Sequence, residues 1–144
     1  MCIGFLVFSH DELRKKNNYL SGNLFIKSDV SIFAPIIIEK MRRPDIVKQI
    51  SQTIHRVEPM ATTLLYGSEA RGDAHPNSDI DLLILLDGDK RDLKRESALS
   101  GELYEIELES GVQISPIIML KTQWENRPFK TPFYINVMNE GIRL

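Results

Sequence analysis

Two neighbouring stretches decide the fold: ATTLLYGSEARGD at residues 61–73 and SDIDLLILL at residues 78–86. The first opens on a short run rich in β-forming residues, so it predicts a strand over residues 61–66 that Gly67 ends. The second predicts a strand over residues 79–86, and its continuous apolar run is typical of a buried central strand.

The segment between these two strands predicts a short helix and a loop. Ser68 is a good N-cap residue for a helix over residues 69–71. Residues 72–77 are rich in turn formers and predict a loop that leads into the second strand.

A helix is predicted before the first strand. Apolar residues there fall at spacings of four, four and three, as on one face of a helix. They are Ile46, Ile50, Ile54 and Val57. Pro44 suits the first helical position, and Pro59 ends the pattern.

Four further elements are predicted beyond the second strand. Gly111 suits the cap that ends a long helix, and Gly101 is expected to weaken or kink that helix. Pro116 favours an edge position or an early break for the strand that follows. The elements are a helix over 90–109, a strand over 112–120, a short helix over 122–126 and a last helix over 132–140. The order α-β-α-β-α-β-α-α predicts an α/β domain with a small mixed sheet and helices packed on it.

Residues 1–40 differ from the rest of the chain, because apolar and polar stretches alternate there without a sustained period. The run MRRPD at 41–45 resembles the beginning of a protein. We expect either that Met41 is the natural start and residues 1–40 are a loosely attached extension, or that they form an ordinary hairpin packed on the core. The domain itself is predicted over residues 41–144.

Composition narrows the class of protein. A chain of 144 residues suits one compact domain. The net charge of −2 lacks the basic excess of proteins that bind long nucleic acids. The single cysteine excludes an internal disulfide and fits a cytoplasmic location, and no apolar run reaches the roughly 18 residues of a membrane span.

Asp79 and Asp81 are the candidate metal ligands. They lie two apart on a predicted strand, so their side chains share one face, with Cα atoms roughly 6.5 Å apart. Two carboxylates on one face repel each other, and a divalent cation relieves this repulsion. Mg²⁺ prefers carboxylate and water oxygens together with nucleotide phosphates.

Gly67, Ser68 and Arg71 are candidate phosphate-binding residues. Glycine lets the main chain approach a ligand closely, and the start of a helix offers free N–H groups. The Ser68 hydroxyl can donate to a phosphate oxygen, and Arg71 adds a positive charge one turn later. A structural ion pair between Arg71 and Asp73 is the alternative.

The motif GSEARGD…SDIDL, residues 67–82, resembles the signature of the polymerase-beta-like nucleotidyltransferase superfamily, and especially its minimal nucleotidyltransferases. The resemblance implies transfer of a nucleoside monophosphate from a triphosphate to a hydroxyl, with release of pyrophosphate. It implies that Asp79 and Asp81 hold Mg²⁺ as catalytic residues. Gly67, Ser68, Arg71 and Ser78 would bind the nucleotide.

The same resemblance suggests partners. Some minimal members are antitoxins that adenylylate a partner of the HEPN type, and others resemble aminoglycoside-modifying enzymes. We therefore expect AMP transfer from ATP to a hydroxyl of a partner protein or a small molecule, with RNA end modification as a further alternative. Only residues 121–144 remain to cover the acceptor, so a homo-oligomer or a second protein is expected to complete its site.

One position departs from the family pattern. A third carboxylate usually follows on the next core strand, and here the matching residue is Gln113, which cannot act as a general base. Three alternatives follow: Glu107 or Glu109 reaches the site, metal alone activates the hydroxyl, or catalysis is weak. In the last case the protein is a regulatory module that binds nucleotide or a partner.

Other residues carry weaker signals. His55 and His75 are expected at the surface, as are the basic pairs Arg42-Arg43 and Lys90-Arg91. Four aromatic residues are expected to pack in the core or an interface, with base stacking as the alternative. They are Trp124, Phe129, Phe133 and Tyr134.

Overall fold

The computed structural model describes residues 41–144, and the expectations for residues 1–40 lie outside the described residues. The elements follow the predicted order, with one short strand added at the end. They are α3 (Pro44–Val57), β1 (Thr62–Tyr66), α4 (Gly67–Arg71), β2 (Ile80–Leu86), α5 (Leu93–Ser110), β3 (Ile114–Leu120), α6 (Lys121–Glu125), α7 (Pro132–Glu140) and β4 (Ile142–Arg143).

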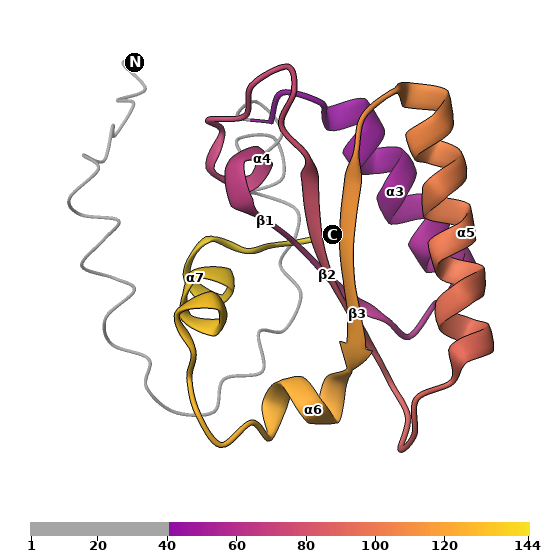
Figure 1. Ribbon diagram of the computed structural model, residues 1–144, viewed down its shortest axis with the longest axis vertical. Helices are drawn as coiled ribbons and strands as arrows, with labels where there is room; N and C mark the ends of the chain where they lie inside the picture. The colour runs from indigo at the N-terminus through magenta and orange to yellow at the C-terminus, as the bar shows by residue number, and fades with distance from the viewer. Residues whose placement is uncertain (1–40) are drawn as a thin grey trace, which may run out of the picture. The chain divides into compact units, whose positions relative to one another are not determined.

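The strands form one mixed sheet in the order β3-β2-β1-β4 (Figure 1). β1 pairs antiparallel with β2 and β4, whereas β2 and β3 are parallel. Helices pack on both faces of the sheet, which confirms the predicted α/β class with a small mixed sheet. None of the helices in the described part of the chain is long and apolar enough to cross a membrane.

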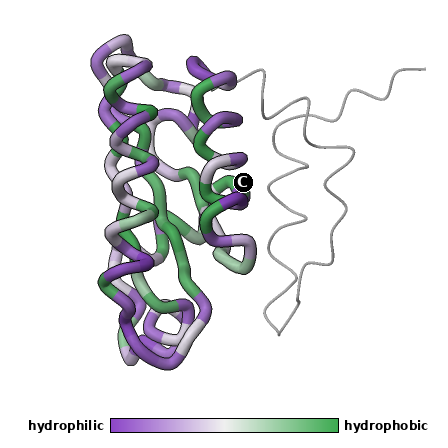
Figure 2. The backbone as a smooth tube through the Cα atoms, turned by 90° about the vertical axis from the view of Figure 1, so that its right-hand side faces the viewer, coloured by the Kyte–Doolittle hydropathy of each residue, from purple (hydrophilic) through white to green (hydrophobic). Residues whose placement is uncertain are grey.

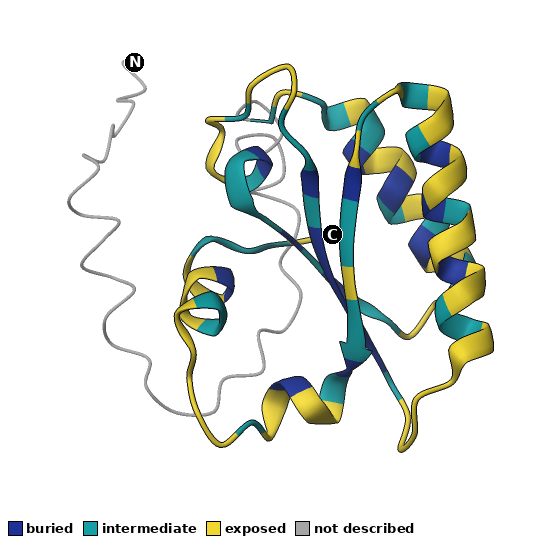
Figure 3. Ribbon diagram, in the orientation of Figure 1, coloured by how far each residue is buried: buried dark blue, intermediate teal, exposed yellow. Residues whose placement is uncertain are grey.

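β2 is the centre of the core, and its two faces meet different helices. Ile80, Leu82, Ile84 and Leu86 join the cluster that contains residues of α3 and α5. Leu83 and Leu85 instead pack with Trp124 of α6 and Val137 of α7. Burial is continuous along β2 beyond Asp81, whereas the loop that leads into it is mostly exposed (Figure 3).

α3 is amphipathic and turns its apolar face to the sheet, whereas α5 also exposes some apolar residues; both colours occur along the helices (Figure 2). Pro44 occupies the first turn of α3, and Ile50 and Ile54 are buried as predicted. α5 begins at Leu93 rather than at residue 90, because the Asp92 side chain accepts hydrogen bonds from the main-chain N–H groups of residues 94 and 95. Residue 101 does not interrupt this helix, and Gly111 caps it at φ 67° as predicted.

The prediction that Ser68 caps α4 is wrong. The helix begins two residues earlier than predicted, at Gly67, and Tyr66 is the N-cap residue without a side-chain hydrogen bond. Ser68 therefore lies inside the first turn, and its hydroxyl is not used as a cap.

β3 is an edge strand, which confirms the prediction from Pro116. The Ile80 N–H donates to the Gln113 carbonyl, so the main-chain groups of the odd-numbered β3 residues point toward β2. The N–H groups of the even-numbered residues therefore point away from β2. The first of them, at Ile114, donates to Glu107 Oε2 at 3.1 Å. The second position is Pro116, which has no N–H. Over the first half of β3, the strand therefore offers no main-chain N–H with which a further strand could pair.

The predicted packing of the aromatic residues holds for three of the four. Trp124 is buried, and its ring lies 5.9 Å from that of Phe133 and 4.9 Å from that of Tyr134. The Arg127 guanidinium covers the Trp124 ring at 4.1 Å. Phe129 is 77% exposed and does not belong to this cluster.

Candidate functional site

Asp79 and Asp81 flank the first residue of β2. Because Asp81 alternates with the buried Ile80 and Leu82, it lies on the face opposite α3 and α5. Neither aspartate is fully buried. On β3, Ser115 pairs with Asp81, and its hydroxyl donates to Asp79 Oδ2 at 3.1 Å. The structure thus brings both predicted carboxylates together and adds a hydroxyl that sequence reasoning missed.

Negative charge is concentrated at this point. Partial burial raises the pKa of Asp81 above its ordinary value, and the neighbouring charge of Asp79 raises it further, while Arg71 lowers it. Burial and the Asp81 charge also raise the pKa of Tyr66. The ionised pair is therefore unfavourable by itself, and a bound cation would relieve the repulsion.

Gly67 brings the main chain against the Asp81 carboxylate. Its φ of 71° lies in the left-handed region, and a Cβ atom there would overlap Asp81 Oδ2 and lie 3.1 Å from Cγ. Glycine is thus required twice, for its backbone conformation and for its missing side chain. The start of α4 and the Asp81 carboxylate therefore lie next to each other.

Arg71 extends from α4 but already has acidic partners. Its guanidinium pairs with Glu140 of α7 at 2.9 Å and with Asp73 at 3.3 Å, and these contacts raise its pKa. The side chain is 45% exposed, so both pairs are accessible to water. The alternative of an ion pair with Asp73 is confirmed, and nucleotide binding by Arg71 stays a prediction.

Ser78 stabilises the loop that leads into β2 through two hydrogen bonds with His75. Its Oγ accepts a hydrogen bond from the His75 main-chain N–H at 2.9 Å, and its own N–H donates to the His75 carbonyl at 3.1 Å. The His75 side chain is exposed, as expected, and so is His55. The predicted nucleotide contact of Ser78 is not tested by this geometry.

Within the described part of the chain, no third carboxylate joins the pair. Among residues 41–144, no group of three or more His, Cys, Asp or Glu side chains could hold a metal ion. Glu107 is bonded to the Ile114 N–H, and Glu109 accepts from Gln49 Nε2 at 3.3 Å. Gln113 is exposed, and its carbonyl accepts from the Ile80 N–H. The alternative in which Glu107 or Glu109 reaches the site is therefore not supported.

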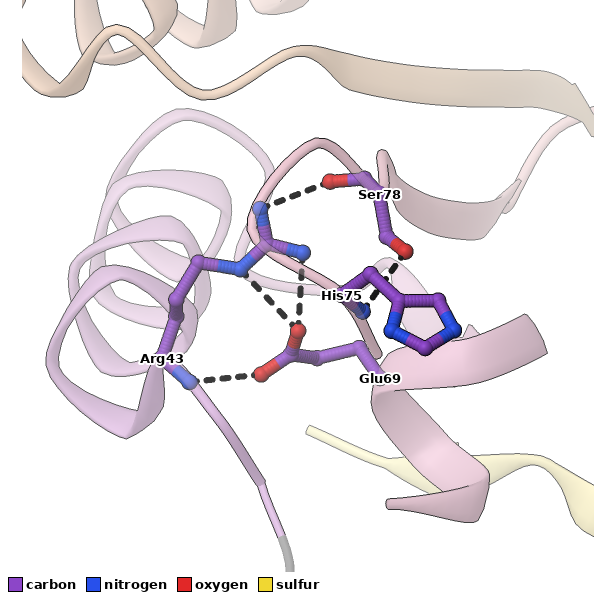
Figure 4. A network of polar contacts seen from close by, with 4 residues as sticks. All are labelled: Arg43, Glu69, His75 and Ser78. Atoms are coloured by element: carbon purple, nitrogen blue, oxygen red, sulfur yellow. Dashed lines mark hydrogen bonds and ion pairs between the residues drawn. The ribbon is translucent and has the colours of Figure 1, made fainter. Parts of the chain in front are cut away.

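Sequence reasoning also missed an ion pair beneath the site. Arg43 was expected at the surface with Arg42, but its side chain is only 10% exposed and pairs with the fully buried Glu69 (Figure 4). Arg42 is exposed, as expected, and so are Lys90 and Arg91. Glu69 itself could have indicated this pair. It lies in the middle of the motif, on a helix that packs on β1 and β2, and a buried carboxylate needs a positively charged side chain as its partner.

The donor set of the site suits a hard divalent cation. Two carboxylates and a hydroxyl are all oxygen donors, and Mg²⁺ is commonly held by one or two carboxylates with water and phosphate oxygens completing its shell. The raised pKa of Asp81 provides a physical reason for a cation at this position. Asp79 and Asp81 could therefore hold the ion, with Gly67 beside them.

Comparison with known proteins identifies the family. Residues 47–144 match the family described as "Nucleotidyltransferase domain". The chain belongs to this nucleotidyltransferase family. A Methanocaldococcus jannaschii protein named "Putative protein adenylyltransferase" is 31% identical over 102 residues, which is 69% of this chain and 96% of that protein. The resemblance inferred from the motif is confirmed.

A solved structure from Sulfolobus solfataricus, titled as a putative nucleotidyltransferase, is also similar to this nucleotidyltransferase domain. It shares 15% sequence identity and superposes with a TM-score of 0.43, covering 83% of this chain and 90% of that chain.

Proposed function

We propose that this nucleotidyltransferase domain transfers AMP from ATP, in a Mg²⁺-dependent reaction, to a hydroxyl group of a partner protein or small molecule. The observation that carries the proposal is the proximity of Asp79, which directly precedes β2, to Asp81 on that strand, with the Gly67 main chain against the Asp81 carboxylate. This arrangement supports a metal-binding pair and a phosphate-binding turn at the same place.

Each residue receives a role in this proposal. Asp79 and Asp81 hold the metal, and the Ser115 hydroxyl fixes the orientation of Asp79. Gly67 and Ser68 bind the triphosphate, assisted by Ser78 and by Arg71 once it exchanges its acidic partners. Bound Mg²⁺ supplies charge neutralisation at the phosphates, which is the larger part of catalysis in phosphoryl-type transfer.

The proposed reaction forms one bond and breaks one. The acceptor hydroxyl oxygen bonds to the α-phosphorus of ATP, and the bond from this phosphorus to the bridging oxygen of the β-phosphate breaks. Pyrophosphate leaves with the electron pair, and the hydroxyl proton passes to water. Because no third carboxylate among residues 41–144 is placed to take this proton, we expect the rate to depend on pH through the acceptor hydroxyl.

The acceptor is proposed to be a protein, following the name of the similar M. jannaschii protein. In this proposal the domain acts as the antitoxin of a toxin–antitoxin pair and modifies a partner of the HEPN type. The partner, or a second copy of the chain, covers the acceptor side of the site. ATP, magnesium and a cytoplasmic location all belong to this proposal.

A second candidate function is a regulatory module that binds nucleotide or a partner and transfers poorly. Its supporting observation is the absence of a third carboxylate near the pair within the described residues. A general base contributes typically ~10²–10⁴ in rate, so its absence slows transfer without preventing nucleotide binding.

The two candidates are separated by incubation with Mg²⁺ and each labelled nucleoside triphosphate, with and without the product of a neighbouring gene. Intact-mass spectrometry should then detect the mass of one monophosphate on the acceptor. Nucleotide binding without any adduct would favour the regulatory module, and absence of both would refute the enzyme and the nucleotide-binding form of the module.

Variants at the site locate the activity. Asp79→Asn and Asp81→Asn should each lower the rate roughly 10²-fold or more, because each removes a charge that the metal needs. Asp87→Asn is the matched control, since Asp87 follows β2 at its other end and its side chain lies 3.8 Å from Lys121. If both site variants keep full activity, the site is elsewhere.

A further inference from the structure

Arg43 joins three segments of the chain below the proposed site (Figure 4). It is the N-cap residue of α3, and its Nε and Nη2 atoms donate to Glu69 Oε2 at 3.0 and 2.9 Å. Its main-chain N–H donates to Glu69 Oε1 at 2.6 Å. Its Nη1 donates to the Ser78 carbonyl oxygen at 2.7 Å. We call Arg43, Glu69 and Ser78 the site-end clamp.

The two segments that Arg43 contacts, α4 and the loop before β2, carry the proposed functional groups. Glu69 is adjacent to Ser68 on α4, and Ser78 is adjacent to Asp79. The direct link between these segments is the mostly exposed loop of residues 72–79. One planar guanidinium therefore fixes the phosphate-binding turn relative to the metal-binding aspartates.

Orientation is the main effect of such a pair. A buried ion pair often stabilises a fold no better than apolar residues of the same volume. A guanidinium, however, presents its donors in a rigid planar fork, which a flexible lysine ammonium cannot reproduce. In the site-end clamp this fork faces a carboxylate on one side and a main-chain carbonyl on the other.

Such precision matters for transfer chemistry. Catalytic groups must be held within about 0.5 Å of their productive positions. A displacement of about 1 Å caused by a remote substitution can lower a rate by ~10²-fold. We propose that Arg43 is a positioning residue, which acts through Glu69 and the Ser78 carbonyl to hold the phosphate-binding turn and the aspartate pair in register. This inference rests on the proposed function.

The protein contains a matched control at the other end of β2. Arg95 donates from Nε and Nη2 to Glu58 at 2.9 and 2.6 Å, and from Nη1 to the Asp87 carbonyl at 3.0 Å. We call Arg95, Glu58 and Asp87 the far-end clamp. It uses the same side-chain groups, without the main-chain N–H contact of Arg43, and lies beyond the opposite end of the strand from Asp79.

The test compares Arg43→Lys with Arg95→Lys in the full-length chain, at a temperature where both remain folded by near-ultraviolet circular dichroism. Binding of Mn²⁺ with α,β-methylene-ATP is measured by electron paramagnetic resonance, which requires no turnover. We expect Arg43→Lys to weaken this binding at least tenfold and Arg95→Lys to change it less than twofold, although both lower the melting temperature. Glu69→Gln and Glu58→Gln form a second matched pair if a lysine variant does not fold.

The outcomes separate the two proposals. If the wild type binds and the matched variants lose affinity equally, or not at all, the role of Arg43 is refuted and the proposed function stands. If the wild type binds no Mn²⁺ with nucleotide, the proposed function fails and the role of Arg43 fails with it. A selective loss in the Arg43 and Glu69 variants supports both.

Discussion

The two clamps at the ends of β2 use the same groups in different surroundings. In each, an arginine pairs with a glutamate through Nε and Nη2 and donates from Nη1 to a main-chain carbonyl. Glu69 is fully buried and the Arg43 side chain is 10% exposed, whereas the corresponding values for Glu58 and Arg95 are 10% and 34%. Water therefore reaches the far-end clamp and scarcely reaches the site-end clamp.

This difference indicates what each clamp contributes. The far-end clamp connects the loop after α3, the turn after β2 and α5, none of which carries a proposed functional group. The site-end clamp connects two segments that do. The same side-chain groups thus connect segments at one end and are proposed to position functional groups at the other, and burial decides how much is lost when a partner is removed.

The largest effect is expected when an arginine is removed. Arg43→Met should lower the free energy of unfolding by about 3–5 kcal/mol, because it leaves the Glu69 charge buried and unpaired. Arg95→Met should cost less, about 1–3 kcal/mol, since water partly solvates Glu58 once the arginine is gone. Urea denaturation followed by circular dichroism measures both. Equal losses would show that burial does not distinguish the clamps.

A second comparison uses two glycines with left-handed backbone. Gly67→Ala should cost roughly 2–5 kcal/mol and abolish Mn²⁺ binding, because the new Cβ atom adds an overlap with Asp81 to the strain of its positive φ. Gly111→Ala, where nothing lies within 4 Å, should cost only about 1–2 kcal/mol from strain and leave binding unchanged. Thermal unfolding and metal titration of both variants provide the measurement.

Should Gly111→Ala prove as damaging as Gly67→Ala, backbone strain alone would account for both losses. The close approach of the main chain to Asp81 would then have no separate importance.

The third comparison concerns pH. Hydrogen bonding to Arg95 lowers the pKa of Glu58, so this stabilisation is present above the ordinary glutamate pKa and is lost as pH falls through the lowered value. Burial and Asp79 raise the pKa of Asp81, so stability falls as pH rises through the window above the ordinary aspartate pKa. Arg95→Met should remove the loss of stability at low pH, and Asp81→Asn should remove the loss of stability as pH rises. Urea denaturation midpoints, measured over a range of pH in the presence of a metal chelator, test both.

Asp81→Asn should also be more stable than the wild type near neutral pH, by less than about 1 kcal/mol because water partly screens the aspartate. A less stable Asp81→Asn variant would contradict the unfavourable charge at the pair.

The smallest effect is expected on α5, the helix that carries Arg95. Gly101 is exposed, has a negative φ and has nothing within 4 Å of a built Cβ atom. Gly101→Ala should therefore stabilise the protein by about 0.5–1 kcal/mol through reduced backbone entropy. The melting temperature should rise, with nucleotide and metal binding unchanged. A fall in nucleotide or metal binding would mean that a change in α5 alters the proposed site.

Sequence reasoning predicted the elements that depend on local pattern. The helix periodicity, the buried β2 and the two aspartates all follow from residues that are neighbours in the chain. The missed features depend on distant partners. Arg43 meets Glu69 from 26 residues away, and Ser115 meets Asp79 from 36 residues away.

The errors at the element ends have equally physical causes. β4 has two residues, too few for any period, and exists because Leu64 and Leu65 of β1 pair with it. Ser68 was expected to cap a helix over residues 69–71, but the helix starts two residues earlier, at the left-handed Gly67.

The free edge of the sheet has a consequence for the pairing of a further strand. An incoming strand needs a row of unpaired N–H groups to add itself to a sheet. On β3, Glu107 occupies the first outward N–H and Pro116 removes the second, and these are the positions level with Ile80 and Leu82. Addition of a further strand beside the aspartates is therefore disfavoured, because the first half of β3 offers it no main-chain donor.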